Sequence, residues 1–345
     1  MKIIILGPVN TKTYYGGVAV FDEELALGFK QIGWKSCIVT ESKNIIHNDK
    51  INIYAGMSFI EIVNFIKQQK PDYVLASLTY GKYFLFLPSK IKKIYFLHGF
   101  FTCSHYGFFK SILASTYQKI MLKYADYTLA NSYFTKMINE DLFNINVNNV
   151  VHLGISNKFI NSNININSNI TKKKNSILFV GRLVDVKKAD KLIEALVILK
   201  NMNIDFTANI VGDGPLYNKI YKIIQQNRLK VNLLGRLYEY EINRLYANSE
   251  VFVSLNPSEP MGIVFLEAMY NDCKIVCPHT GGQVELFEGI NNVVSFVNED
   301  NPEEIALAIK KVISTNSIGY GNISKEIFLY KNVAINVVRS VEEHN

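Results

Sequence analysis

The chain has 345 residues, of which 48% are hydrophobic and 19% are charged, and its formal net charge is +7. This composition excludes a disordered chain, and the length predicts two domains. No apolar run approaches the roughly 20 residues that span a bilayer. The opening MKIIILGP is not a signal peptide, so we expect a cytoplasmic protein.

The excess of cations suits an anionic partner such as a nucleotide diphosphate, a nucleic acid or a membrane surface, although solubility alone would also account for it. The four cysteines, Cys37, Cys103, Cys273 and Cys277, form no C-x-x-C pair. Neither a zinc site nor a redox motif is therefore predicted.

The first part of the chain alternates apolar runs with amphipathic stretches. Strands are predicted at KIIILG, SCIVT, YVLAS, KIYFLH, YTLANS and NVVHLG, and helices at Val18–Trp34 and at residues 58–72. Continuous apolar strands that alternate with helices are typical of a parallel sheet covered on both faces. We predict an α/β domain over residues 1–160.

A segment rich in Asn, Ile and Ser interrupts this alternation, and we predict a linker over residues 161–175. The strand runs SILFVG, TANIVG, VNLLG, EVFVSL and CKIVC follow it and predict a second α/β domain over residues 176–323. Residues 324–345 are expected to form a helix that packs back on the first domain. Ligands of such domains bind at the carboxyl ends of the strands.

Two loops of the first domain follow strands and contain candidate binding residues. Gly16 and Gly17 precede the first long helix, where glycine lets the backbone approach a ligand, although a plain turn explains them equally well. His98 ends a strand, and a structural role remains an alternative for it.

A cluster of cations follows the strand SILFVG. Arg182 stands directly after it, and Lys187 and Lys188 come at the start of the next helix, where cations oppose the helix dipole. A diphosphate would suit this cluster because Arg grips phosphate oxygens with two donors and Lys adds a point charge. A solvated run of charges is the alternative.

The stretch SEPMGIVFLEAM predicts a loop followed by a buried helix. The first N–H groups of that helix need partners, which an anion would supply. A carboxylate at Glu267 is costly in such a helix unless it accepts hydrogen bonds, and ligand hydroxyls are suitable donors. Glu259 lies in the preceding loop.

Together these pieces resemble glycosyltransferase family 4, the retaining nucleotide-sugar transferases of the GT-B fold. The matching pieces run in the family's order: YYGG, VGRL, VGDGPL, LLGRL, PSEPMG with LEAM, and TGGQVE. The resemblance implies two Rossmann-like domains facing across a cleft. Two departures are Pro260-Met261, where a small residue and an aromatic are usual, and Lys188, where Gly is common.

The resemblance also implies roles for the candidate residues. Arg182 and Lys187 would grip the donor diphosphate, Glu267 would bind the ribose, and Glu259 and His98 would contact the donor sugar. These four catalytic candidates are His98, Glu259, Arg182 and Lys187. The donor-binding candidates are Gly16, Gly17, Lys188, Gly235, Met261, Gly262, Ile263, Val264 and Glu267.

The expected function is transfer of a hexose or N-acetylhexosamine, with retention, from a nucleotide-sugar to a glycan or lipid-linked acceptor in the biosynthesis of cell-surface polysaccharides or glycans. UDP is the favoured nucleotide. No D-x-D motif is present, so we expect no metal and no other cofactor. A nucleotide-sugar epimerase and a non-catalytic nucleotide-sugar-binding partner subunit remain alternatives, and nucleic-acid binding is not expected.

The acceptor would be recognised by the first domain. Residues 107–125, GFFKSILASTYQKIMLKYA, combine aromatic and basic side chains, and Lys90, Lys92 and Lys93 lie nearby in the sequence. These features predict peripheral contact with an anionic membrane, at the inner face of the cell membrane. A core-packed helix with a solvated face is the alternative.

Overall fold

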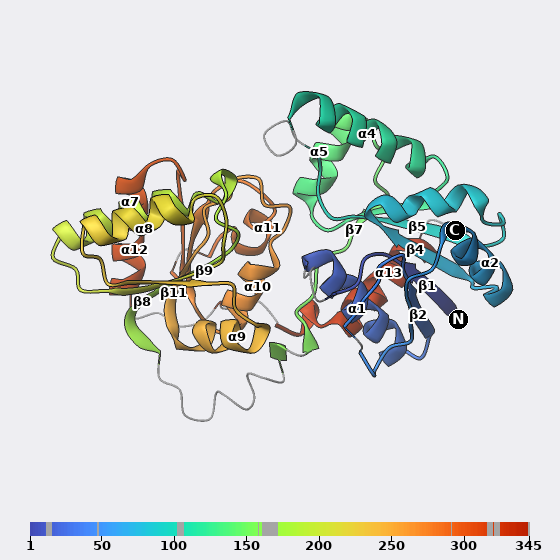
Figure 1. Ribbon diagram of the computed structural model, residues 1–345, viewed down its shortest axis with the longest axis horizontal. Coiled ribbons are helices and arrows are strands. Elements are labelled where there is room, and N and C mark those ends of the chain that lie inside the picture. Colours follow the sequence, from blue (N-terminus) through green and yellow to red (C-terminus); the bar gives the residue numbers. More distant parts are fainter. Residues whose placement is uncertain are drawn as a thin grey trace. The chain divides into compact units, whose positions relative to one another are not determined.

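The computed structural model describes residues 1–11, 16–46, 48–101, 107–157, 159–160, 172–290, 292–315, 320 and 325–343. The chain divides into two compact units. The first comprises Met1–Asn157 and Glu326–Asn345, and the second comprises Lys158–Lys325. Each unit contains one sheet flanked by helices (Figure 1).

The first unit contains a seven-stranded parallel sheet in the order β3-β2-β1-β4-β5-β6-β7. Its strands are β1 (Lys2–Leu6), β2 (Lys35–Val39), β3 (Ile53–Tyr54), β4 (Tyr73–Ser77), β5 (Lys92–Leu97), β6 (Tyr127–Ala130) and β7 (Asn149–Val150). Its helical elements are α1 (Gly17–Gln31), α2 (Phe59–Gln69), η1 (Leu78–Phe86), α4 (Phe108–Leu122), α5 (Tyr133–Phe143) and α13 (Tyr330–Glu342). The short η3 (Lys325–Phe328) precedes α13.

Strand β1 explains why the sequence shows continuous apolar runs. Ile3 and Ile5 pack on one face of the sheet with α1 and α13, whereas Ile4 and Leu6 pack on the other with α2 and η1. Because alternate residues point to opposite faces, a strand covered on both sides needs apolar residues at every position.

The C-terminal helix α13 packs against α1. A Cβ on Gly28 of α1 would lie 2.2 Å from the carbonyl oxygen of Tyr330, so only glycine permits this approach. The Tyr330 side chain is completely buried and also lies against Gly154. These contacts make residues 326–343 part of the first unit's core.

The second unit contains a six-stranded parallel sheet in the order β10-β9-β8-β11-β12-β13. Its strands are β8 (Lys173–Val180), β9 (Thr207–Val211), β10 (Val231–Gly235), β11 (Ser249–Val253), β12 (Lys274–Pro278) and β13 (Val294–Val297). Its helical elements are η2 (Asp185–Lys187), α7 (Ala189–Asn201), α8 (Tyr217–Gln226), α9 (Glu239–Asn248), α10 (Ile263–Tyr270), α11 (Val284–Phe287) and α12 (Pro302–Ser314). The predicted α/β class is confirmed in both units.

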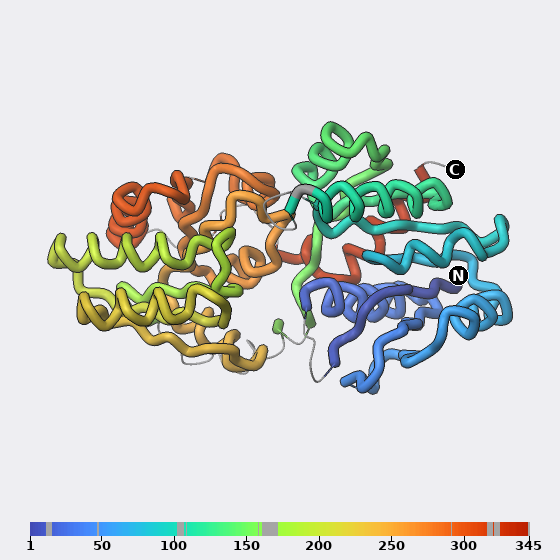
Figure 2. Tube along the Cα trace, turned by 45° about the horizontal axis from the view of Figure 1, so that its top comes forward, coloured from blue at the N-terminus to red at the C-terminus, as the bar shows by residue number. Residues whose placement is uncertain are grey.

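Helices cover both faces of this second sheet. The core on one face is built by α7, α8 and α12 with the strands, and α9 and α10 contact the sheet on the other face (Figure 1). Figure 2 follows the same alternation of strands and helices along the chain, from green through yellow to orange.

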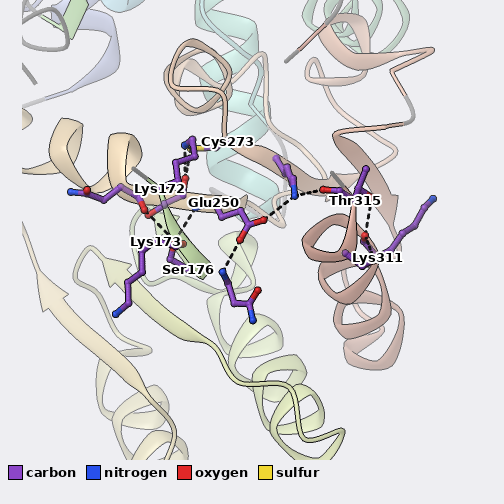
Figure 3. A network of polar contacts seen from close by, with 12 residues as sticks. Lys172, Lys173, Ser176, Glu250, Cys273, Lys311 and Thr315 are labelled. Carbon is purple, nitrogen blue, oxygen red and sulfur yellow. Dashed lines mark hydrogen bonds and ion pairs between the residues drawn. The ribbon is translucent and has the colours of Figure 1, made fainter. Parts of the chain in front are cut away.

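The predicted linker ends too late in the sequence. β8 begins at Lys173, so residues 173–175 belong to a strand, and the first unit ends at Asn157 rather than at residue 160. Lys172 explains the misassignment, because its ammonium donates 2.5 Å to the carbonyl of Ser249 (Figure 3). The lysine run therefore includes an anchor to the sheet, and residues 161–171 lie outside the described residues.

A polar network joins the amino ends of β11 and β12. Glu250 accepts a hydrogen bond from the backbone of Asn175 at 2.6 Å and pairs with the ammonium of Lys274 at 2.9 Å. Lys274 also donates 2.7 Å to the carbonyl of Thr315. Only 7% of Lys274 is exposed. Glu250 and Thr315 are labelled in this network in Figure 3. This buried ion pair lies at the edge of the sheet opposite to the loops that follow the strands.

We expect Glu250→Gln to lower the free energy of unfolding by about 3 kcal/mol, because a buried ammonium then loses its counterion. Urea unfolding would measure the loss. Asp205→Asn, which removes the exposed ion pair with Lys230, is the matched control and should change stability little. Equal stabilities for the two variants would contradict the importance of the buried pair.

Candidate functional site

Two loops, at the carboxyl ends of β8 and β9, pack closely together because glycines in the second loop have no side chain. A Cβ on Gly212 would lie 1.8 Å from the carbonyl oxygen of Gly181, and one on Gly214 would lie 2.5 Å from that of Leu183. The backbone N–H of Leu183 donates 2.9 Å to the carbonyl of Asp213. The VGDG loop is thus the support on which the loop with the predicted cations rests.

The cations of that loop differ in their surroundings. Arg182 is exposed, and its guanidinium makes no ion pair with any residue that the structure describes. Lys188 adopts a left-handed conformation with φ of 52°, which agrees with glycine being common at this position in the resembled family. Its ammonium pairs with Asp300 at 2.7 Å, so its side chain is directed to the loop after β13.

Lys187 and Glu259, both predicted to be catalytic, are in contact. The ammonium of Lys187 lies 2.5 Å from a carboxylate oxygen of Glu259, and the side chain of Asn256 donates 2.7 Å to the same oxygen. The side chains of the pair are only 21% and 13% exposed. An ammonium has three hydrogens, so Lys187 can bind Glu259 and still donate to another anion.

The start of α10 is built around Gly262. Its φ of 80° favours glycine, and no side chain among the described residues caps the helix. Met261 is completely buried, whereas Ile263 and Val264, in the first turn of the helix, are half-buried. This end therefore offers backbone donors and a positive dipole to an anion.

The TGGQVE loop supports this helix start. The N–H of Gly282 donates 2.8 Å to the carbonyl of Glu259, and a Cβ on Gly282 would lie 2.0 Å from the carbonyl oxygen of Pro260. The backbone at Gly282 thus lies directly against the loop that carries Glu259. At the far edge of the sheet, Gly235 ends β10 with φ of 66°, and its carbonyl accepts a hydrogen bond from the N–H of Gly212, after β9, at 2.7 Å.

Glu267 lies on α10 and has a polar neighbour that sequence reasoning missed. The hydroxyl of Tyr246, on α9, donates 3.4 Å to the carbonyl of Val264 on α10 and lies close enough to the carboxyl group of Glu267 to oppose the rise in its pKa. Burial raises the pKa of Glu267 to about 8, with a smaller contribution from Glu239. No motif signals Tyr246, because its side chain reaches Glu267 from another helix.

In the first unit, Gly16 is the N-cap of α1, and a Cβ on Gly17 would meet no atom of the described residues within 4 Å. Packing against those residues therefore does not require glycine at position 17. The tyrosines of YYGG lie outside the described residues.

His98 follows β5 and is held by residues that the motifs did not reveal. Its Nε2 lies 3.0 Å from Oγ of Ser77, which lies 2.8 Å from Oδ1 of Asp22. The rings of Phe21 and Phe96 pack on the imidazole at centroid distances of 4.7 and 5.0 Å. Burial lowers the pKa of His98 to about 3, so the imidazole is neutral at physiological pH.

The structure thus brings Lys187 and Glu259 together on loops that also present Arg182 and the start of α10. His98, Gly16 and Gly17 belong to the first unit, and the other candidates belong to the second. Among the described residues, no group of three or more His, Cys, Asp or Glu side chains could hold a metal ion.

Comparison with known proteins identifies relatives of the second unit. Residues 161–326 match the family described as glycosyl transferases group 1. An uncharacterized glycosyltransferase of Methanocaldococcus jannaschii is 30% identical over 143 residues, which cover 41% of this chain and 39% of that protein. A second relative, 28% identical over 158 residues, is the Campylobacter jejuni GalNAc-alpha-(1->4)-GalNAc-alpha-(1->3)-diNAcBac-PP-undecaprenol alpha-1,4-N-acetyl-D-galactosaminyltransferase. The match covers 45% of this chain and 42% of that protein. The chain spans about two fifths of the length of these relatives.

A solved structure resembles the whole chain. The pneumococcal O-GlcNAc transferase GtfA, in complex with UDP and GlcNAc, superposes with a TM-score of 0.70 at 12% identity, covering 100% of this chain and 99% of that one. At this identity the likeness shows the fold alone. The expected GT-B fold with two Rossmann-like domains is confirmed.

The raised pKa of Glu267 predicts how stability changes with pH. Between the ordinary pKa of about 4.3 and the folded value of about 8, the folded chain binds more protons than the unfolded chain. Stability contributed by this group is therefore complete at low pH and falls as pH rises through that window. Glu267→Gln cannot titrate, so its stability relative to the natural chain should increase by about 1 kcal/mol or more between pH 5 and 8.

Urea unfolding at both pH values would measure this difference. Glu303→Gln, an exposed change in the first turn of α12, is the control and should give the same difference from the natural chain at either pH. Parallel stability curves for Glu267→Gln and the natural chain would contradict the raised pKa.

Proposed function

We propose that this chain, whose residues 161–326 belong to the group 1 glycosyltransferases, transfers a hexose or N-acetylhexosamine from a nucleotide-sugar to a glycan or lipid-linked acceptor. The observation that carries the proposal is the second unit's loop cluster. It presents the exposed Arg182, the Lys187–Glu259 pair and the uncapped start of α10 at the carboxyl edge of one sheet. This arrangement suits a sugar joined to a diphosphate.

The leaving nucleoside diphosphate gains negative charge as its bond to the sugar breaks. Arg182 and the two remaining ammonium hydrogens of Lys187 would stabilise that charge, and the N–H groups at Gly262 to Val264 would add to it. Glu259 would bind the sugar hydroxyls while it fixes Lys187 at 2.5 Å. Retention of configuration follows from the family resemblance.

UDP is the nucleotide that we favour, with the carboxyl of Glu267 binding the ribose hydroxyls. The pneumococcal neighbour was solved with UDP and GlcNAc, and the name of the Campylobacter relative describes an N-acetylgalactosaminyltransferase with a lipid-linked acceptor. These names support a role in the biosynthesis of cell-surface polysaccharides or glycans. We also propose that activity needs no metal, because the cations can neutralise the diphosphate.

A nucleotide-sugar epimerase and a non-catalytic binding subunit are the alternatives. An epimerase would convert the donor sugar without an acceptor, and a binding subunit would bind the donor without consuming it. A screen of UDP-, GDP- and ADP-sugars for binding and for slow hydrolysis, in excess EDTA and without acceptor, separates the three. We expect hydrolysis of one UDP-sugar to the free sugar and UDP.

Peripheral membrane contact is supported by α4 in the first unit. One stripe of this helix and of the turn that follows it is exposed and apolar, and lysines flank it. The apolar members are Phe109, Ile112, Leu113, Tyr117, Ile120 and Tyr124, and the lysines are Lys110, Lys119 and Lys123. The alternative of a core-packed helix with a merely solvated face does not account for Phe109 at 84% and Leu113 at 73% exposure. We propose that this stripe lies on an anionic bilayer.

Within the described part of the chain, no helix is both long enough and apolar enough to cross a membrane.

Arg182→Ala and Lys187→Ala should each reduce the turnover of the hydrolysed UDP-sugar by about 100-fold, because each removes a preorganised charge from the leaving diphosphate. Turnover would be measured as UDP release at saturating donor. Lys230→Ala removes a cation that pairs with exposed Asp205 outside these loops, and it should retain normal turnover. Near-normal turnover in both loop variants would overturn the assignment.

The membrane contact predicts that Phe109→Asp/Leu113→Asp will lower binding to vesicles that contain anionic phospholipid by at least about tenfold, since both apolar insertion and charge attraction are weakened. Co-sedimentation at low and high salt would measure it. Lys222→Glu on α8, where the lysine is also exposed, is the control and should bind like the natural chain. Binding that is indifferent to anionic lipid and to the α4 changes would rule the contact out.

A further inference from the structure

Three side chains form a buried polar chain in the first unit. Asp22 comes from α1, Ser77 from the end of β4 and His98 from the loop after β5. We propose that Asp22 and Ser77 hold the imidazole of His98 as the tautomer with hydrogen on Nδ1, so that it donates a hydrogen bond to a ligand oxygen. Asp22 and Ser77 are thus positioning residues. The identity of the ligand rests on the proposed function, but the tautomer does not.

The environment of Asp22 favours a carboxyl group that keeps its proton. The side chain is completely buried, and among the described residues its Oδ2 has no hydrogen-bond partner. No described cation forms an ion pair with it. Burial raises the pKa of Asp22 well above its usual value, the hydrogen bond from Ser77 opposes this rise to a smaller extent, and the like charge of Glu23 adds to it.

Gly7 fixes where this carboxyl group lies. A Cβ on Gly7 would be 1.9 Å from Oδ2 of Asp22, so any larger residue would displace the carboxyl group. Oδ2 therefore faces backbone, and Oδ1 is the oxygen that has a polar neighbour. The hydroxyl of Ser77 lies 2.8 Å from Oδ1 and donates to it when the carboxyl group is charged. When Asp22 is protonated, its proton is best placed on Oδ1 and Ser77 accepts it, so the direction of this hydrogen bond reverses.

The hydrogen count then determines the tautomer of His98. Ser77 has one hydroxyl hydrogen, and its two polar side-chain neighbours among the described residues are Asp22 and His98. If Ser77 accepts from Asp22, its own hydrogen is donated to Nε2 of His98 at 3.0 Å. An imidazole that accepts at Nε2 and is neutral carries its hydrogen on Nδ1.

A charged Asp22 would give the opposite result. Ser77 would then donate to the carboxylate, Nε2 would donate to Ser77, and Nδ1 would be an acceptor. The ring cannot readily exchange its two nitrogens, because Phe21 and Phe96 pack against it. Among the described residues, Nδ1 of the partly buried His98 makes no hydrogen bond, so that nitrogen is the one available to a ligand.

Nitrogen NMR of the natural chain labelled with ¹⁵N-histidine distinguishes the two tautomers without any ligand. His98→Asn assigns the His98 signals by their disappearance. We expect hydrogen on Nδ1 and no protonation of the ring between pH 8 and about pH 5. A hydrogen on Nε2, or a charged ring in this range, would overturn the inference.

Two variants test whether Asp22 and Ser77 set the tautomer of His98. Ser77→Ala removes the donor to Nε2 and should shift the population toward hydrogen on Nε2. Asp22→Asn keeps a neutral donor next to Ser77 and should preserve the natural tautomer. An unchanged tautomer in a folded Ser77→Ala variant would refute the positioning role. Because NMR of the tautomer requires no catalytic activity, the inference about His98 can be tested even if the proposed function is wrong.

A final measurement tests the ligand contact. Addition of the UDP-sugar that binds in the donor screen should shift the Nδ1 signal of His98, and Ser77→Ala should lower turnover about tenfold with little change in KM. Absence of both effects, with the natural tautomer confirmed, would show that the donor hydrogen serves the fold instead of a ligand.

Discussion

The direct contact between backbone segments of neighbouring loops is the constraint on which the second unit's candidate site depends. At Gly212 and Gly282 a Cβ would lie 1.8 and 2.0 Å from carbonyl oxygens of the adjoining loops. The loop that carries Arg182 therefore rests on the VGDG loop, and the loop that carries Glu259 rests on the TGGQVE loop, each through main-chain atoms. The ion pair between Lys187 and Glu259 joins these two supported loops.

Much of the fold could be predicted because each sheet is covered on both faces. Ile3 to Leu6 must all be apolar for that reason, and such runs are visible without a structure. β3 and β13 give no such signal, since the first has two residues and the second includes half-buried positions that interrupt the apolar pattern. The start of β8 is hidden as well, because lysines that bind backbone carbonyls look like solvated charge.

The candidate residues were predictable as chemical types, but their partners were not. A motif reports spacing along the chain, whereas Lys187 meets Glu259 from 72 positions away and Ser77 meets Asp22 from 55 positions away. Tyr246 and Asp22 carry no local signal for the same reason. Motifs therefore do not reveal the neighbours that determine whether a carboxyl group keeps its proton. Glu267 and Asp22 are two examples, because their surroundings raise the pKa of each.

The polar network around Glu250 and Lys274 lies at the amino ends of the strands, and the glycine loops lie at the carboxyl ends. A sheet that is stabilised at the amino ends of its strands can tolerate substitutions in the loops at their carboxyl ends without losing its architecture. Natural variation in Pro260 or in the neighbouring loops could thus be sampled while the fold persists. The second unit is therefore built so that change in its loops and retention of its scaffold are largely separate problems.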